Sequence, residues 1–242
     1  MPVDNPLFWL LAVCGVLFTG ISKSGFAGGA GVIAVPLLAL VIDVPAAAAL
    51  MLPLLLVMDI RTIAYYRREA NWRELKLILP GAFLGIVCGG MLLGAVPPQA
   101  LKQLLGIMCL VFAGWQALAP LLSRLRHTAL LWGGVSGLAS TLIHAGGPPI
   151  NIYLIGRRLS KAQWLATAGL FFGFMNLLKV VPYSYLGQWQ SELLLVGLAL
   201  IPVALLGVKL GNWIQHQISE QHFLLISRIF LAGSGLLLLL TA

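Results

Sequence analysis

Charged residues are scarce in this sequence. Asp, Glu, Lys and Arg together make up 9% of the 242 residues, whereas a soluble globular domain carries about a quarter. The chain is also 60% apolar. Together these two proportions argue against a cytosolic enzyme, a nucleic-acid-binding module and a secreted scaffold. They predict an all-α, polytopic integral membrane protein without a separate soluble domain.

Cysteine and acidic residues are few as well. Cys14, Cys88 and Cys109 lie in apolar runs without a CxxC pair, so neither a disulfide framework nor a metal cluster is predicted. The seven acidic residues show no HExxH or DxxD spacing, and a membrane-embedded enzyme would need such a constellation. We therefore expect no enzyme activity, no cofactor and no metal. Asp4 near the amino terminus also argues against a cleaved leader.

Long apolar runs fill most of the sequence. They predict helical segments at residues 7–22, 32–42, 45–66, 76–96, 99–122, 129–143, 149–156, 162–186, 191–213 and 222–241. The runs at 32–42 and 149–156 are shorter than the ~20 residues that cross a membrane core. Each follows a helix-breaking stretch, 23–31 in one case and 144–149 in the other. We expect each break to form the tip of a re-entrant helical hairpin.

The two halves of the chain align with each other. A shift of 118 residues places the break at 27–29 on the break at 145–147 and Arg61 on Lys179, and a shift of 122 aligns later proline and glycine positions. An internal duplication is therefore predicted. The first repeat is 1–122, with hairpin 7–42 and helices 45–66, 76–96 and 99–122. The second is 129–242, with hairpin 129–156 and helices 162–186, 191–213 and 222–241.

Basic residues predict the orientation of these segments. They cluster at 67–76, 124–126 and 157–161, which marks these connections as cytoplasmic. Each half then contains one hairpin and three crossings, and because three is odd the second repeat is inverted relative to the first. We expect both termini outside, in a bacterial-type inner membrane. Inverted repeats with broken helices are a recurring architecture of secondary transporters.

The two breaks are the candidate binding site. Backbone N–H groups at a helix start favour an anion, although glycines also serve simply to let helices pack closely. Hydroxyl and amide side chains near the breaks either donate to a substrate or tie helices together. The candidate substrate-binding residues are Ser22, Lys23, Ser24, Gly25, Gly28, Gly29, Ser140, Thr141, His144, Gly146, Gly147, Pro148, Asn151 and Asn176.

Ionisable residues inside apolar segments are the most specific candidates for a functional role, because burying charge in hydrocarbon is costly. Lys23 is predicted to recognise charge, unless its stem carries the ammonium to an interface. His144 either bonds substrate and changes protonation, or is structural. Arg61 and Lys179 are candidate cationic gates or plain flanks. Asp59 either neutralises a neighbouring base or serves as a proton site for coupling.

The breaks also carry a family resemblance. The sequence resembles the TauE/SafE family of sulfite and organosulfonate exporters at Gly25 to Gly31 followed by Val35-Pro36-Leu37, and at Gly146-Gly147-Pro148 followed by Tyr153-Leu154. It departs from the family at Ala46 to Ala49, where a Ser or Thr is often found. The resemblance implies a permease for small sulfur oxyanions, or for organic anions that carry a sulfonate or a carboxylate.

The predicted function is therefore the transport, as a probable exporter, of small anions such as sulfite, sulfoacetate or related sulfonates. Alternating access would occur around a site between the hairpins. A passive anion channel is the alternative, and a membrane-embedded enzyme ranks below both. The predicted partners are a small anion, the lipid bilayer, protons as a candidate coupling ion and a second copy of the chain in a candidate homodimer. No nucleic-acid partner is expected.

Overall fold

A computed structural model describes residues 4–26, 33–114, 128–214, 217 and 220–242. Within these residues all regular structure is helical, which confirms the predicted all-α class. Among the described helices, α1, α3, α4, α9 and α10 are long and apolar enough to cross a membrane. The elements are α1 (Pro6–Gly25), α2 (Ala34–Leu38), α3 (Val44–Tyr66), η3 (Arg67–Glu69), α4 (Trp72–Ala95), α5 (Pro98–Ala113), α7 (Ala129–Ile143), α8 (Gly147–Ile155), α9 (Lys161–Tyr185), α10 (Ser191–Ile214) and α11 (Glu220–Leu240).

Local sequence signals explain where several helices begin. Asn5 accepts a hydrogen bond from the Leu7 N–H at 2.9 Å, and a proline follows in the first turn of α1. Ser160 and Gln163 form a reciprocal capping box at the start of α9. These side chains satisfy N–H groups that a helix start leaves without a partner. The predicted bounds of these helices are accordingly close to the observed ones.

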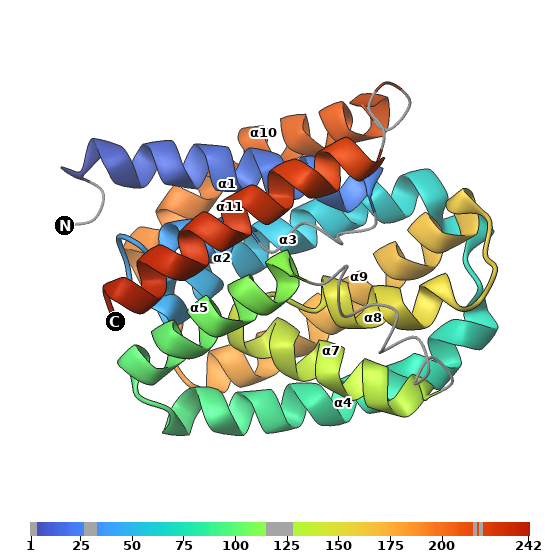
Figure 1. Cartoon of the computed structure of the whole chain (residues 1–242), viewed down its shortest axis with the longest axis horizontal. Coiled ribbons are helices and arrows are strands. Elements are labelled where there is room, and N and C mark those ends of the chain that lie inside the picture. The colour runs from blue at the N-terminus through green and yellow to red at the C-terminus, as the bar shows by residue number, and fades with distance from the viewer. Residues whose placement is uncertain (1–3, 27–32, 115–127, 215–216, 218–219) are drawn as a thin grey trace.

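Two helix pairs are parallel and very closely packed (Figure 1). In α4 and α7, a Cβ added at Gly81 would lie 2.1 Å from the Leu130 carbonyl oxygen, and one at Gly85 would lie 2.1 Å from that of Gly134. In α1 and α10, Gly20 lies against Gly207 in the same way. Small residues let membrane helices approach at this distance. Close glycine packing therefore joins α4 to α7 and α1 to α10.

Two further pairs are antiparallel. Asp59 of α3 is hydrogen-bonded to Asn176 of α9, whereas Thr62, further along α3, lies beside Gly169, which comes earlier in α9. Helices α5 and α11 are also antiparallel to each other, because residue 99 contacts residue 242 and residue 113 contacts residue 228. The helices that the sequence alignment matches, α3 with α9 and α5 with α11, thus run in opposite directions. This is the arrangement expected for inverted repeats.

The second hairpin lies close to its predicted bounds, whereas in the first hairpin α1 is longer than predicted and α2 is shorter. Helix α1 has 20 residues and α2 has 5, whereas α7 has 15 and α8 has 9. The long contact of α1 with α10 continues to Gly25, which packs on Gly211, and this extends α1 beyond its expected end at residue 22. The exact division of the chain at residues 122 and 129 stays a prediction, because 115–127 lie outside the described residues.

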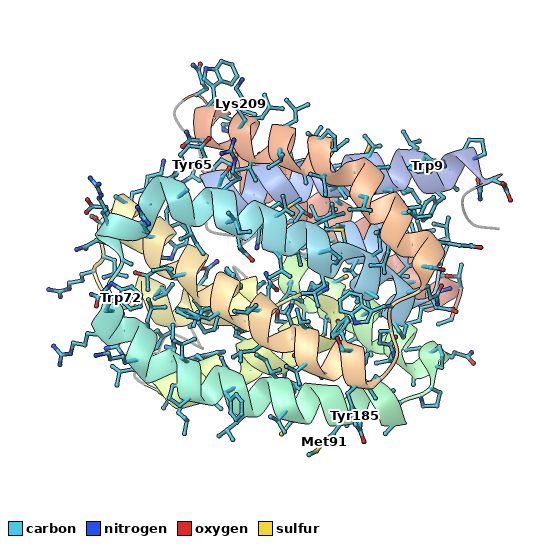
Figure 2. The ribbon with its side chains drawn as sticks, turned by 180° about the vertical axis from the view of Figure 1, so that it is seen from behind. Trp9, Tyr65, Trp72, Met91, Tyr185 and Lys209 are labelled. Atoms are coloured by element: carbon cyan, nitrogen blue, oxygen red, sulfur yellow. The ribbon has the colours of Figure 1, made fainter. Side chains whose placement is uncertain are left out.

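The ends of the bundle differ in composition. Figure 2 shows Tyr65, Trp72 and Lys209 at one end and Trp9 at the other. The first turn of α1 and the last turn of α11 lie together at the Trp9 end (Figure 1). Arginines 67 and 68 are exposed at the opposite end, in the turn between α3 and α4. The chain therefore presents its basic connection and its two terminal helix ends at opposite ends of the molecule.

Candidate functional site

Buried polar side chains gather where α1, α3, α7 and α9 meet. Among them are two lysines from different halves of the chain, with Lys23 only 8% exposed and Lys179 fully buried. Unpaired charge in such surroundings is costly, so the partners of each lysine decide its role. Both lysines were candidates from the sequence, one for charge recognition and one as a gate.

The first group links three helices through a carboxylate. Lys23 of α1 forms an ion pair with Asp59 of α3 and also lies 3.4 Å from the Leu55 carbonyl oxygen. On the other side of the carboxylate, the Asn176 amide of α9 donates to Asp59 Oδ2 at 2.6 Å. Both oxygens of Asp59 are therefore engaged. Asp59 is therefore paired with Lys23, 36 residues away in the chain, rather than with the nearby Arg61 from which its neutralising role was predicted. Its use as a proton site stays a proposal.

The second group contains a lysine without a carboxylate. Lys179 Nζ lies 2.9 Å from Ser140 Oγ, 3.2 Å from the Ser140 carbonyl oxygen and 2.6 Å from His144 Nδ1. In the described part of the chain, no Asp or Glu lies within ion-pair distance of this lysine. Its ammonium is therefore hydrogen-bonded by neutral groups but not neutralised.

His144 is held in place by an uncommon backbone conformation. Its φ is 55°, the left-handed region, and it ends α7. The His144 N–H bonds the Ser140 carbonyl oxygen at 3.0 Å, and the next N–H bonds that of Ala139 at 3.2 Å, a helix end usually made with glycine. This turn aims the ring at two partners. Nε2 lies 2.8 Å from the Ala48 carbonyl oxygen, which only accepts, so Nδ1 is left to accept from Lys179.

A small cavity separates the two groups. Its volume is about 20 Å³, which holds about one water molecule. Gly147 at its wall opens α8, and the two prolines that follow have no N–H to offer. At this break the two prolines therefore reduce the number of backbone donors on which the sequence interpretation relied. The lining residues are Thr19, Lys23, Leu55, Ser140, His144, Gly147, Phe172 and Asn176.

Three lining residues were not predicted from the sequence: Thr19, Leu55 and Phe172. A usable signal existed, because each lies four residues before a polar residue of the site. Thr19 precedes Lys23, Leu55 precedes Asp59, and Phe172 precedes Asn176 on the same helix face. Extending each candidate by one helical turn would have found all three.

Other predicted residues contact neighbouring helices rather than the cavity. Ser24 Oγ donates to the Val208 carbonyl oxygen at 2.7 Å, and Gly25 packs on Gly211. Thr141 donates to the Gly137 carbonyl oxygen at 2.8 Å, while the Gly146 carbonyl oxygen accepts from Ser136 at 2.6 Å. Ser22 is buried in α1.

The remaining candidates lie elsewhere in the fold. Pro148 is buried in the first turn of α8, and Asn151 follows one turn later with its Oδ1 buried and without a hydrogen-bond partner. Arg61, which the alignment matches to Lys179, is exposed on α3 and does not line the cavity. Gly28 and Gly29 lie outside the described residues.

A second polar contact anchors α8 at the basic end. The Tyr153 hydroxyl donates to Glu74 Oε2 at 2.5 Å, and Arg157 forms an ion pair with the same carboxylate at 3.3 Å. The Arg157 guanidinium also lies over the Tyr153 ring at 4.2 Å. Helix α8 is thereby tied to the first turn of α4.

The structure places buried cations between two broken helix pairs, in an apolar bundle whose matched helices run in opposite directions. These features together define an integral membrane transporter. The model of the family described as sulfite exporter TauE/SafE matches residues 11–238. The chain belongs to this family, as the sequence resemblance predicted, and it is a membrane transporter rather than an enzyme.

One curated relative is the probable inner membrane transporter protein TsaS of Comamonas testosteroni. The two are 28% identical over 177 residues, which cover 70% of this chain and 72% of that protein. No solved structure gives a significant match to this chain.

Proposed function

We propose that this chain exports a small sulfur oxyanion, or a small organic anion carrying a sulfonate or a carboxylate, by alternating access. The observation that carries this proposal is a pair of buried lysines at one cavity. Lys23 lines it, and Lys179, which has no carboxylate partner among the described residues, contacts the lining residues Ser140 and His144. An anion is the ligand that such a cation requires.

The cavity wall offers suitable donors for an oxyanion. In the wall itself the Lys23 ammonium, the Asn176 amide and the Ser140 hydroxyl can donate. The Lys179 ammonium is not a lining group but lies 2.9 Å from Ser140 Oγ, directly behind the wall. A hydrogen bond to a charged group contributes about 1.5–3 kcal/mol. An anion with several oxygens would use these donors together, whereas a neutral solute would leave the charge of Lys179 uncompensated. The rest of the wall carries no net charge and consists of Thr19, Leu55, His144, Gly147 and Phe172.

The small size of the cavity favours a carrier over an open channel. With room for about one water molecule, it cannot admit an oxyanion until the surrounding helices part. The close pairs α1 with α10 and α4 with α7 are candidates for bodies that move as units. The contact of Glu74 with Tyr153 and Arg157 would keep α8 with α4 during this motion. Access from alternate sides would then follow from rocking one body against the other.

Counterflow in proteoliposomes tests the proposal. The purified chain is reconstituted, and uptake of labelled sulfite is measured against sulfite, sulfate, thiosulfate, sulfoacetate and simple carboxylates on the opposite side. A carrier gives saturable uptake that an accepted anion on the far side stimulates. Uptake that never saturates and ignores the far side indicates a passive channel. If no anion in the panel moves faster than in protein-free vesicles, the proposal is wrong. Lys209→Met, which removes an exposed cation, is the matched control.

We also propose that the end bearing Arg67 and Arg68 faces the cytoplasm, because basic connections stay inside. Both chain termini would then lie outside. An amino-terminal tag should be accessible to antibody in intact spheroplasts, and a tag protected until the cells are lysed would reverse this orientation. Proton coupling and a homodimer stay predictions of the sequence.

A further inference from the structure

Few charged groups surround the cavity in the part of the chain that the structure describes. Lys23 on α1, Asp59 on α3 and Lys179 on α9 are the charged groups, and His144 at the end of α7 is neutral when it accepts from Lys179. Helices α2 and α8 contain no Asp, Glu, His, Lys or Arg, and neither do residues 27–32, which are alanine, glycine and valine. Arg61 on α3 is exposed. With both lysines protonated, the site therefore has one more positive than negative charge.

Asp59 sits behind this cavity rather than in its wall. It contacts Lys23 and Asn176, which both line the cavity, but it is not itself a lining residue. An incoming anion would meet Lys23 while Asp59 still holds the other side of the same ammonium. Asp59 therefore changes the charge that the anion experiences without occupying the space that the anion needs. Charge imbalance in such low-dielectric surroundings is strongly unfavourable.

We propose that Asp59 sets the charge of the anion that this transporter accepts. An anion with one negative charge brings the site to neutrality while Asp59 is ionised. A dianion leaves one excess negative charge unless a proton from water on the loading side binds an Asp59 carboxylate oxygen. The proton leaves again when the dianion does, so a dianion travels with one proton and each cycle moves one net negative charge with either substrate. This inference rests on the proposed anion transport and specifies its substrate class.

Methanesulfonate and sulfate are suitable probes, because both have a tetrahedral sulfur and they carry one and two charges across neutral and mildly acidic pH. Their dissociation constants are measured with the purified full chain at constant ionic strength. Wild-type protein should bind methanesulfonate about tenfold or more tightly than sulfate near pH 8. Because the proposed dianion is accompanied by one proton, sulfate binding should strengthen as the pH is lowered, whereas methanesulfonate binding should not.

Asp59→Asn should invert this preference. The variant keeps a side chain that bonds Lys23 but raises the net charge of the site by one, so sulfate should become the tighter ligand. The ratio of the two constants should shift by about tenfold or more and should lose its dependence on pH. The matched control is Asp43→Asn, which removes an exposed carboxylate at the other end of α3 and should leave the ratio unchanged.

Two variants at Asn176 keep the test valid if Asp59→Asn does not fold. Asp59→Asn combined with Asn176→Asp moves the carboxylate to the facing helix and should restore the preference for methanesulfonate. Asn176→Asp alone adds a negative charge and should weaken the binding of sulfate more than the binding of methanesulfonate.

The ratio of the two dissociation constants decides the role of Asp59. An identical ratio in wild type and in the folded charge variants would overturn that role while leaving anion transport intact. Transport of other anions without any methanesulfonate binding would overturn it too. If the protein showed no saturable transport of any anion, the proposed transport function itself would be wrong.

Discussion

The two buried lysines stand in contrast to each other. Lys23 shares a carboxylate with Asn176 of the facing helix, whereas Lys179 is surrounded by a hydroxyl, a carbonyl and an imidazole. A buried ion pair is strongly coupled to the folded state, since removing one partner strands the other. A cation held only by neutral groups has charge left for a ligand. Stability and anion binding are thus expected to depend on different lysines.

The helix framework around them is far more alike in the two halves. The pair α1 with α10 and the pair α7 with α4 both run parallel with glycines in contact. The charged residues do not follow this likeness, because the sequence counterpart of Lys179 is the exposed Arg61. A nearly symmetric scaffold therefore carries an asymmetric site, and the two halves should respond differently to equivalent substitutions.

The largest effect is expected from Lys23→Met. Asp59 would be left buried opposite an apolar side chain, which should lower the free energy of unfolding by about 3–5 kcal/mol. Chemical unfolding in detergent measures this change. The double variant Lys23→Met with Asp59→Leu should recover most of the lost stability, but it should not recover transport. A single variant as stable as wild type would show that the ion pair does not hold these helices.

A smaller effect of a different kind is expected from Lys179→Met. Losing a charged donor should weaken anion binding by about 10–100-fold. The free energy of unfolding should change by no more than about 1–2 kcal/mol, because the lost hydrogen bonds are offset by the removal of a buried charge. Binding and unfolding are measured on the same preparation, with Lys209→Met as control. Destabilisation equal to that of Lys23→Met would erase the distinction between the two lysines.

The scaffold itself is tested by two adjacent glycines of α7. A Cβ at Gly133 would lie 2.2 Å from the Ile78 carbonyl oxygen, whereas one at Gly134 would lie 3.6 Å from the nearest atom of α4. Gly133→Ala should therefore destabilise the protein by about 1–3 kcal/mol through overpacking. Gly134→Ala should change stability by less than about 0.5 kcal/mol. Thermal unfolding compares the two, and equal losses would contradict the close packing of α4 on α7.

Much of the site could be placed near the breaks from sequence, but its internal contacts could not. Lys23 and Ser24 are adjacent, so both were equal candidates. Helical geometry turns one toward Asp59 on α3 and the other toward Val208 on α10. The neighbours on each side of a helix come from segments far away in the chain. Closeness to a glycine-rich break therefore could not predict what Ser24, Gly25 and Thr141 contact.

The sequence by itself determined the helices, the broken segments and the membrane class, because hydropathy, caps and glycine or proline breaks act over a few neighbouring residues. Only the tertiary structure decided that Asp59 forms its ion pair with Lys23 and that His144 and Ser140 are hydrogen-bonded to Lys179. It also decided that Arg61 is exposed. These partners lie 35 or more residues apart in the chain. Their meeting depends on helix direction and rotation, which are set by close glycine contacts between distant helices.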